Sequence, residues 1–221
     1  MSTYSVQSAN AATLATNKLI KNTYILLSVT LLFSAIMAAV SVAVQLPPMM
    51  SLVCMIGGMV LAMFVLPRTA NSSTGLLIVF AITGLLGFSL GPMLSAYLSM
   101  PNGSELIATA FGGTGVIFLG LSGYALTTRK NFNFMGGFLV AGILMVLVVM
   151  VANIFLQIAA LSLALSAVVI MLMAGFILFD TSRMVRGEAD NYIMMTVSLY
   201  INMFNIFVHL LHLLGFASGD D

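Results

Sequence analysis

Long apolar stretches alternate with short polar breaks along the chain, and this pattern predicts helices that cross a lipid bilayer. A helix needs about 20 mostly apolar residues to span the hydrocarbon core of a membrane. Seven stretches meet this requirement, at 24–44, 49–66, 75–98, 105–127, 134–155, 158–180 and 192–216. The pattern therefore predicts an all-α, polytopic membrane protein with seven transmembrane helices.

The breaks between these stretches contain residues that end helices or turn the chain. Pro-containing breaks follow the first three stretches, at 47–48, 67–68 and 101–104. The apolar run at 134–180 is too long for one span, and we expect Asn153 and Gln157 to mark a turn within it. Without that turn the chain would cross the membrane six times, and its carboxyl terminus would change side.

All basic residues fall on one side of a seven-span arrangement. They precede the first span or lie in alternate connections: Lys18, Lys21, Arg68, Arg129, Lys130, Arg183 and Arg186. The positive-inside rule assigns the side that carries Lys and Arg to the cytoplasm. We therefore expect a cytoplasmic amino terminus and an external carboxyl terminus.

Outside the spans the chain is short and polar. Residues 1–22 are rich in Ser, Thr, Ala and Asn and lack apolar periodicity, so we expect a flexible cytoplasmic tail. This tail is either a ragged end or a handle for a cytoplasmic partner. A seven-helix domain at 23–217 and a short external tail at 218–221 follow. The first span could also be read as a signal peptide, but its length favours a membrane anchor.

The composition supports lipid as the surrounding medium. Charged residues make up 6% of the chain, hydrophobic residues make up 61%, and the mean hydropathy is +1.16. A soluble domain carries about 25% charged residues. The net charge of +1 gives no basic field for nucleic acid, and no glycine loop for a phosphate-containing cofactor is present.

The residues do not indicate an enzyme. Proteolysis inside a membrane needs a serine and a histidine, or two aspartates, brought together in the fold. No nucleophile motif surrounds any serine, and Asp180 is the one aspartate expected within a span. We therefore predict a protein without catalytic residues or cofactors, unless the fold creates a convergent Ser–His or Asp–Asp pair.

Asp180 is the strongest candidate for chemistry inside the membrane. It ends the apolar run MLMAGFILFD, ahead of a basic loop. Polar groups within spans are costly and usually face the interior of a bundle. Two interpretations stay open: an interfacial acid paired with Arg183 at i+3, or a buried, titratable carboxylate that senses pH or gates a pathway.

The seventh span carries a polar stripe on one helical face. Its members recur every three or four residues: Ser198, Asn202, Asn205, His209 and His212. We favour hydrogen bonds between helices over the wall of a polar pathway. A metal ion would need a third ligand beside the two histidines, and none is obvious, so we predict packing histidines and no metal site.

Small residues are concentrated in the third span. Gly84, Gly87 and Gly91 recur at helical spacing, and the last two form a GxxxG pair. Such residues allow helices to approach closely, so we expect a packing face, with a hinge as the alternative. Pro92 follows directly and predicts a kink at this point.

Several stretches together resemble one family. They are KNTYILLSVTLLFSAI, TGLLGFSLGPMLSAYLS, LTTRKNFNFMGG, VVMVANIFLQ, GFILFDTS and TVSLYINMFNIFVHLL. The chain resembles the Bax inhibitor (TMBIM, or LFG) family over nearly all of its length, and most closely the bacterial YccA branch. This resemblance implies a seven-helix bundle with a central helix, located in a bacterial inner membrane, with a periplasmic carboxyl terminus.

The resemblance also implies two alternative functions. Members of the YccA branch associate with the membrane-bound ATP-dependent protease FtsH and its HflK/HflC assembly. They act as a substrate pulled by its cytoplasmic tail and as a modulator of the degradation of membrane proteins such as SecY. We predict this function, with residues 1–22 as the tail.

Other members of the family are pH-sensitive calcium leak channels, which use two intramembrane aspartates as their sensor. The first aspartate maps onto Asp180, whereas Asn202 occupies the position of the second. Two carboxylates that share a proton titrate as a coupled pair, and an asparagine cannot take part in one. A cation or proton leak gated near Asp180 is therefore the alternative.

Overall fold

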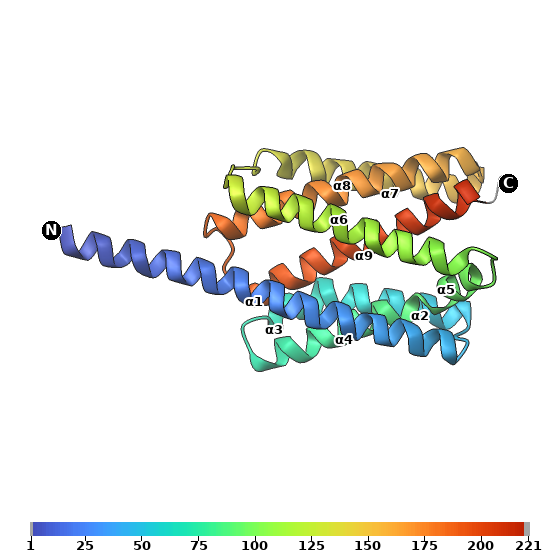
Figure 1. Cartoon of the computed structure of the whole chain (residues 1–221), viewed down its shortest axis with the longest axis horizontal. Coiled ribbons are helices and arrows are strands. Elements are labelled where there is room, and N and C mark those ends of the chain that lie inside the picture. Colours follow the sequence, from blue (N-terminus) through green and yellow to red (C-terminus); the bar gives the residue numbers. More distant parts are fainter. Residues whose placement is uncertain (1, 219–221) are drawn as a thin grey trace. The chain divides into compact units, whose positions relative to one another are not determined.

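The computed structural model describes the backbone of residues 2–218 and the side chains of residues 13–218. Its elements in chain order are α1 (Ser2–Ala43), α2 (Pro48–Val60), the π-helical η1 (Leu61–Val65), α3 (Leu66–Thr69), α4 (Ser73–Ser89), α5 (Gly91–Leu98), α6 (Gly103–Thr128), α7 (Met135–Leu156), α8 (Ala159–Val185) and α9 (Tyr192–Ser218) (Figure 1). The described residues form no strand. The predicted all-α class is therefore confirmed.

Seven helical segments are long and apolar enough to cross a membrane. They are Thr13–Ala43, Pro48–Thr69, Ser73–Leu98, Gly103–Thr128, Met135–Leu156, Ala159–Val185 and Tyr192–Ser218. Each coincides with one of the predicted spans, so the count of seven is confirmed. The six-span alternative fails because the turn inside the apolar run at 134–180 is present.

Asn153 and Gln157 make this turn between α7 and α8. Gln157 adopts a left-handed conformation (φ 53°) and ends α7. The Asn153 side chain accepts a hydrogen bond from the backbone N–H of Ile158 (3.1 Å) and donates one to the Ser162 hydroxyl (2.7 Å). The polar residues that signalled the turn therefore satisfy the exposed backbone groups at the two helix ends.

The chain divides into two compact units, and α9 contributes to both. Unit 1 comprises residues 1–101 and 187–200, and unit 2 comprises residues 102–186 and 201–221. Unit 1 thus holds α1 to α5 with the first turns of α9, whereas unit 2 holds α6 to α8 with the remainder of α9.

In unit 1, α4 packs against both α1 and α2. Val79, Ile82 and Leu86 on α4 are fully buried. The glycine stripe faces α1: a β-carbon at Gly84 would lie 2.8 Å from the Phe33 ring. At Gly87 and Gly91 a β-carbon would run into Ser34 and Ser41 of α1. These glycines therefore hold α4 and α5 close to α1.

Tyr200 joins the first turns of α9 to unit 1. Its side chain is 1% exposed, and its hydroxyl lies 2.6 Å from the Ser34 hydroxyl on α1. The same hydroxyl donates a hydrogen bond to the Thr83 carbonyl oxygen on α4 (3.2 Å). One buried phenol thus connects three helices within this unit.

Two prolines lie within spans and disturb the helices in different ways. The second span was expected to end at Pro67-Arg68, but it continues to Thr69. The wide π turn of η1 directly precedes Pro67, which lies in the first turn of α3. The kink expected at Pro92 appears as a break at Leu90, between α4 and α5.

In unit 2, α8 packs against α6 and α7, and Figure 1 shows α7 and α8 side by side. A β-carbon at Gly142 of α7 would lie 2.6 Å from Leu172 of α8. A β-carbon at Gly175 of α8 would lie 2.6 Å from Leu139 of α7. Reciprocal glycines therefore allow these two helices to interlock.

The predicted tail differs from the structure in one respect. α1 begins at Ser2, so most of the segment at 1–22 is helical, and the first span extends back to Thr13. Ser, Thr and Ala break apolar periodicity without preventing a helix, which is why the pattern alone indicated no element there. The predicted external tail at 218–221 lies outside the described residues, apart from Ser218 at the end of α9.

Basic residues gather at one end of each unit. In unit 1, Thr196 near the start of α9 donates to the Thr23 carbonyl oxygen (3.3 Å), next to Lys21. Asn191 donates to the Ala70 carbonyl oxygen (2.9 Å), close to Arg68. In unit 2, the Ser182 hydroxyl donates to the Lys130 carbonyl oxygen (2.7 Å). Within each unit the bases named here thus lie near one another, and the side of the membrane on which they lie stays a prediction.

A glycine-to-alanine pair tests the packing of unit 1. In Gly87→Ala the new methyl group would clash with the backbone carbonyl of Ser34, so we expect a loss of about 1–3 kcal/mol of stability. In Gly120→Ala the methyl group would meet no heavy atom of the described residues within 4 Å, so we expect no loss. Thermal unfolding in one detergent measures both, and equal stability of the two variants would contradict the close contact.

Candidate functional site

A buried carboxylate and a buried amide form the centre of the candidate site. The Asn202 side chain on α9 donates a hydrogen bond from Nδ2 to Oδ2 of Asp180 on α8, over 3.2 Å. Both residues are 5% exposed, and both belong to unit 2. The structure therefore brings together the two positions that the resemblance singled out, with one carboxylate between them.

Asp180 is the first of three consecutive buried polar residues on α8. Successive residues of a helix point about 100° apart, so these three side chains face different neighbours. Asp180 faces α9, and the Thr181 hydroxyl lies 3.4 Å from the Ser122 hydroxyl of α6. Ser182 contacts the connection between α6 and α7. One short segment of α8 is thus bonded to three parts of unit 2.

Ser182 fixes the loop between α6 and α7. Its hydroxyl donates to the Lys130 carbonyl oxygen (2.7 Å) and accepts a hydrogen bond from the backbone N–H of Phe132 (3.3 Å). Ser182 is fully buried. Both sides of this turn are therefore tied to the end of α8.

Arg183 does not form the expected pair with Asp180. Its guanidinium lies over the Phe179 ring, 5.6 Å from the centroid, and within the described part of the chain it makes no ion pair with Asp180. A cation over an aromatic face is attracted by the electron density of the ring. The expected Asp180–Arg183 pair is therefore wrong, and a carboxylate that senses pH or gates a pathway stays a prediction.

The side chains of the polar stripe on α9 do not share one partner. Ser198 belongs to unit 1, whereas the other members belong to unit 2. Asn202 bonds to α8, but the Asn205 amide donates to the Ile201 carbonyl oxygen of its own helix (2.8 Å). The spacing of three or four residues places both asparagines on one face of the helix, so the sequence could not predict that their side chains bond to different partners.

His209 and His212 converge on Ser166 of α8. Their Nδ1 atoms lie 3.1 Å and 3.0 Å from its hydroxyl oxygen. The same hydroxyl donates to the Ser162 carbonyl oxygen (3.0 Å). Ser166 is 2% exposed. The arrangement fits a connection between α8 and α9 that uses all the bonding capacity of one hydroxyl.

This geometry bears on the two chemical alternatives for the histidines. Both rings aim Nδ1 at one hydroxyl oxygen, and the described residues contain no group of three His, Cys, Asp or Glu side chains that could hold a metal ion. A convergent Ser–His pair does exist, but a nucleophilic serine must give its proton to the base and be accessible to a substrate. Ser166 gives its proton to a backbone carbonyl and is buried.

Sequence analysis did not identify four polar residues of this region. They are Ser122, Ser166, Thr181 and Ser182. Thr181 and Ser182 follow Asp180 directly, and that run of three polar residues near a span end was the available signal. Serine and threonine in a helix usually bond to the carbonyl four residues earlier, so their sequence position alone gives no partner.

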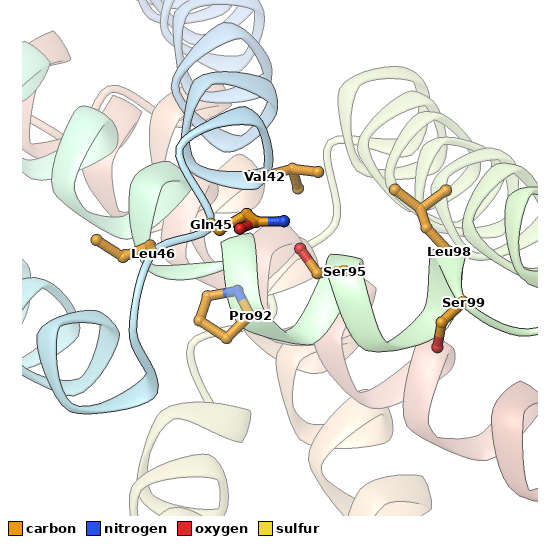
Figure 2. A pocket seen from close by; sticks show the side chains of 7 residues that line it. All are labelled: Val42, Gln45, Leu46, Pro92, Ser95, Leu98 and Ser99. Carbon is orange, nitrogen blue, oxygen red and sulfur yellow. The ribbon is translucent and has the colours of Figure 1, made fainter.

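Unit 1 contains an uncharged pocket of about 450 Å³ (Figure 2). The end of α1, the following turn and α5 line it with Val42, Gln45, Leu46, Pro92, Ser95, Leu98 and Ser99. The side chains of Gln45 and Ser95 point into the same space. Gln45 has a left-handed backbone (φ 52°), at the position where α1 ends. None of the lining residues carries a charge.

Comparison with known proteins gives matches over almost the whole chain. A family model described as inhibitor of apoptosis-promoting Bax1 matches residues 16–219. An Escherichia coli K12 protein named modulator of FtsH protease YccA is 53% identical over 207 residues, which cover 94% of each chain.

Two further relatives have no assigned function. An uncharacterised membrane protein of Vibrio cholerae is 49% identical over 209 residues, covering 95% of this chain and 94% of its own. An uncharacterised protein of Pseudomonas aeruginosa is 42% identical over 218 residues, covering 99% and 98%. Similarity of this extent covers both units and the whole candidate site.

Two asparagines of α9 test the bond at Asp180. Asn202→Ala removes a donor from a buried carboxylate, so we expect a loss of about 2 kcal/mol of stability. Asn205→Ala, one turn along the same helix, removes only a bond to its own backbone, so we expect a change within about 0.5 kcal/mol. Thermal unfolding of the two purified variants measures the difference, and losses of equal size would show that the Asp180 bond contributes little.

Proposed function

The chain belongs to the Bax inhibitor family, and from this premise we propose that it is a bacterial inner-membrane protein that binds the membrane-bound ATP-dependent protease FtsH. FtsH acts here with its HflK/HflC assembly. The chain is both a substrate of this protease and a modulator of the turnover of other membrane proteins. The observation that carries this proposal is the 53% identity, over 94% of both chains, to a protein named modulator of FtsH protease.

The start of α1 is the segment suited to engage such a protease. An ATP-driven unfoldase has to grip a segment that is not packed into the bundle. Within unit 1, the amino-terminal part of α1 extends beyond the other helices of that unit (Figure 1). Thr16 of α1 lies beside Gly187, in the connection before α9, and Thr196 of α9 bonds to Thr23 of α1. Residues 2–12 precede these contacts.

The distribution of charge supports a cytoplasmic position for this segment. In each unit the basic residues lie at one end, which the positive-inside rule assigns to the cytoplasm. The amino terminus then lies on the side where ATP is available, and the carboxyl terminus lies in the periplasm. Effects on the SecY translocon follow indirectly, through competition for the same protease.

Removal of residues 2–12 tests the proposed function. Because the protease loses the segment that it grips, we expect degradation of the truncated protein to slow several-fold in growing cells. The contacts of Thr16 and Thr23 remain, so we also expect an unchanged melting temperature in detergent. Pulse-chase labelling measures the first quantity and thermal unfolding the second.

A matched control replaces residues 2–12 with a Gly/Ser sequence of equal length. This variant restores a segment that can be gripped without restoring its sequence, so we expect degradation at close to the normal rate. A truncated protein that is folded and still degraded at the normal rate would exclude the tail as the point of engagement.

The buried Asp180 supports a second candidate, a leak for Ca²⁺ or H⁺. Ionisable residues within spans are expensive and commonly belong to ion pathways. The neighbouring Asn202 offers an amide in place of a second acid, so any gate here works with a single carboxylate.

The leak function predicts that Asp180→Asn changes Ca²⁺ or H⁺ flux, because it removes the charge inside the span. Flux into liposomes that contain purified protein, measured across a range of pH, checks this expectation. Asn205→Ala serves as the control and should conduct like the wild type. Absence of flux from the wild type at every pH would eliminate the leak function.

A further inference from the structure

We propose that unit 2 carries a binding site for the phosphate of an anionic phospholipid, formed by Arg129, Lys130 and Arg183. The site lies where α6 and α8 end and α7 begins, and it is independent of the proposed protease function. Three observations support it: a fixed loop, basic side chains without an ion pair among the described residues, and an exposed apolar surface beside them.

The loop that carries two of the bases is fixed at several points. Arg129 ends α6 in a left-handed conformation (φ 50°), and its N–H donates to the Ala125 carbonyl oxygen (3.0 Å). The Ser182 hydroxyl holds the Lys130 carbonyl oxygen and the Phe132 N–H. The Asn131 side chain accepts a hydrogen bond from the N–H of Asn133 (2.8 Å). A fixed backbone lowers the entropy lost when a ligand is bound.

Arg183 joins this surface from α8. It follows Ser182, and its guanidinium lies over one face of the Phe179 ring. Phe179 in turn contacts the first turn of α7, since a β-carbon at Gly136 would lie 3.0 Å from that ring. The packing therefore keeps Arg183 at the start of α7, at the same end of the unit as Arg129 and Lys130.

The charges of these bases are available to a ligand. Arg129 and Lys130 are exposed, and neither forms an ion pair with any residue whose side chain is described. The described acids of unit 2 are Asp180, which is buried, and Glu105, which lies in the first turn of α6 at its opposite end. Among the described residues of unit 2, this end therefore carries bases and no exposed acid, and such a cluster attracts an anion.

The surroundings favour a lipid over a soluble anion or an acidic protein. Phe134 and Phe138 at the start of α7 are 80% and 68% exposed, and Leu144 and Met145 further along α7 are 59% and 70% exposed. Acyl chains can cover this apolar face while the phosphate stays with the bases at the end of the span. A basic cluster next to a span end is the usual arrangement for an anionic headgroup.

Binding of tail-labelled cardiolipin to the full-length protein in a nonionic detergent tests the proposal. Each base near a phosphate contributes about fivefold to affinity, so we expect Arg129→Gln/Lys130→Gln to weaken binding about 25-fold. Labelled phosphatidylcholine should bind weakly to both proteins. An unchanged affinity for cardiolipin in the double variant would overturn the site.

Arg68→Gln is the matched control. Arg68 belongs to unit 1, and its guanidinium donates to the Phe64 carbonyl oxygen one turn earlier (2.6 Å). We expect less than about a twofold effect, below the fivefold for a base in contact with phosphate. If Arg68→Gln lost as much cardiolipin affinity per removed charge as the double variant, the lipid would be responding to the general positive charge of the protein and not to a specific site.

Two further variants separate charge from folding and position. Arg129→Lys/Lys130→Arg keeps both charges and should retain binding, whereas Ser182→Ala keeps every charge, releases the loop and should weaken binding several-fold. If Ser182→Ala bound cardiolipin with full affinity, the claim that binding depends on the fixed loop would be overturned. Displacement of cardiolipin by millimolar glycerol phosphate would identify a soluble phosphate as the ligand and overturn the lipid site.

Discussion

A carboxylate inside a membrane span has to be hydrogen-bonded by the protein, because the lipid around it offers no donor. Asn202 supplies one such donor to Asp180 over 3.2 Å, and this bond joins α8 to α9. The hydroxyls of Thr181 and Ser182 extend the same principle to α6 and to the loop that follows it. Helices that share an apolar solvent thereby gain specific partners, since apolar contacts in lipid distinguish poorly between one neighbour and another.

The polar bonds inside the spans and the exposed polar surface perform different tasks. Asn202, Ser166 and the two histidines use their hydrogen-bonding capacity within the bundle. The segments that we propose for partners are the start of α1 in unit 1 and the loop of Arg129 and Lys130 in unit 2. This division is consistent with a protein that acts by binding a protease and lipids. It also gives Asn202 a bonding role that needs no second charge.

Sequence predicted the spans well because lipid imposes a simple rule on length and polarity. It placed the turn at Asn153 and Gln157, but it ended the second span at Pro67 and missed the helical start of α1. A π turn before Pro67 depends on backbone geometry that composition does not encode. For the site, sequence identified Asp180 and Asn202, whereas it expected Arg183 beside Asp180 and not over Phe179. It also missed Ser166, since a serine in a helix shows its partner only once the helices are packed.

Affinity purification from native membranes in a mild detergent tests the central claim most directly, namely that this bundle works by binding a membrane-bound protease. The full-length chain would serve as bait, with an unrelated seven-span protein expressed at the same level as the reference. The account predicts that peptides of FtsH, HflK and HflC are strongly enriched with this chain and not with the reference. If the folded chain recovered no more FtsH than the reference protein does, the account would be contradicted.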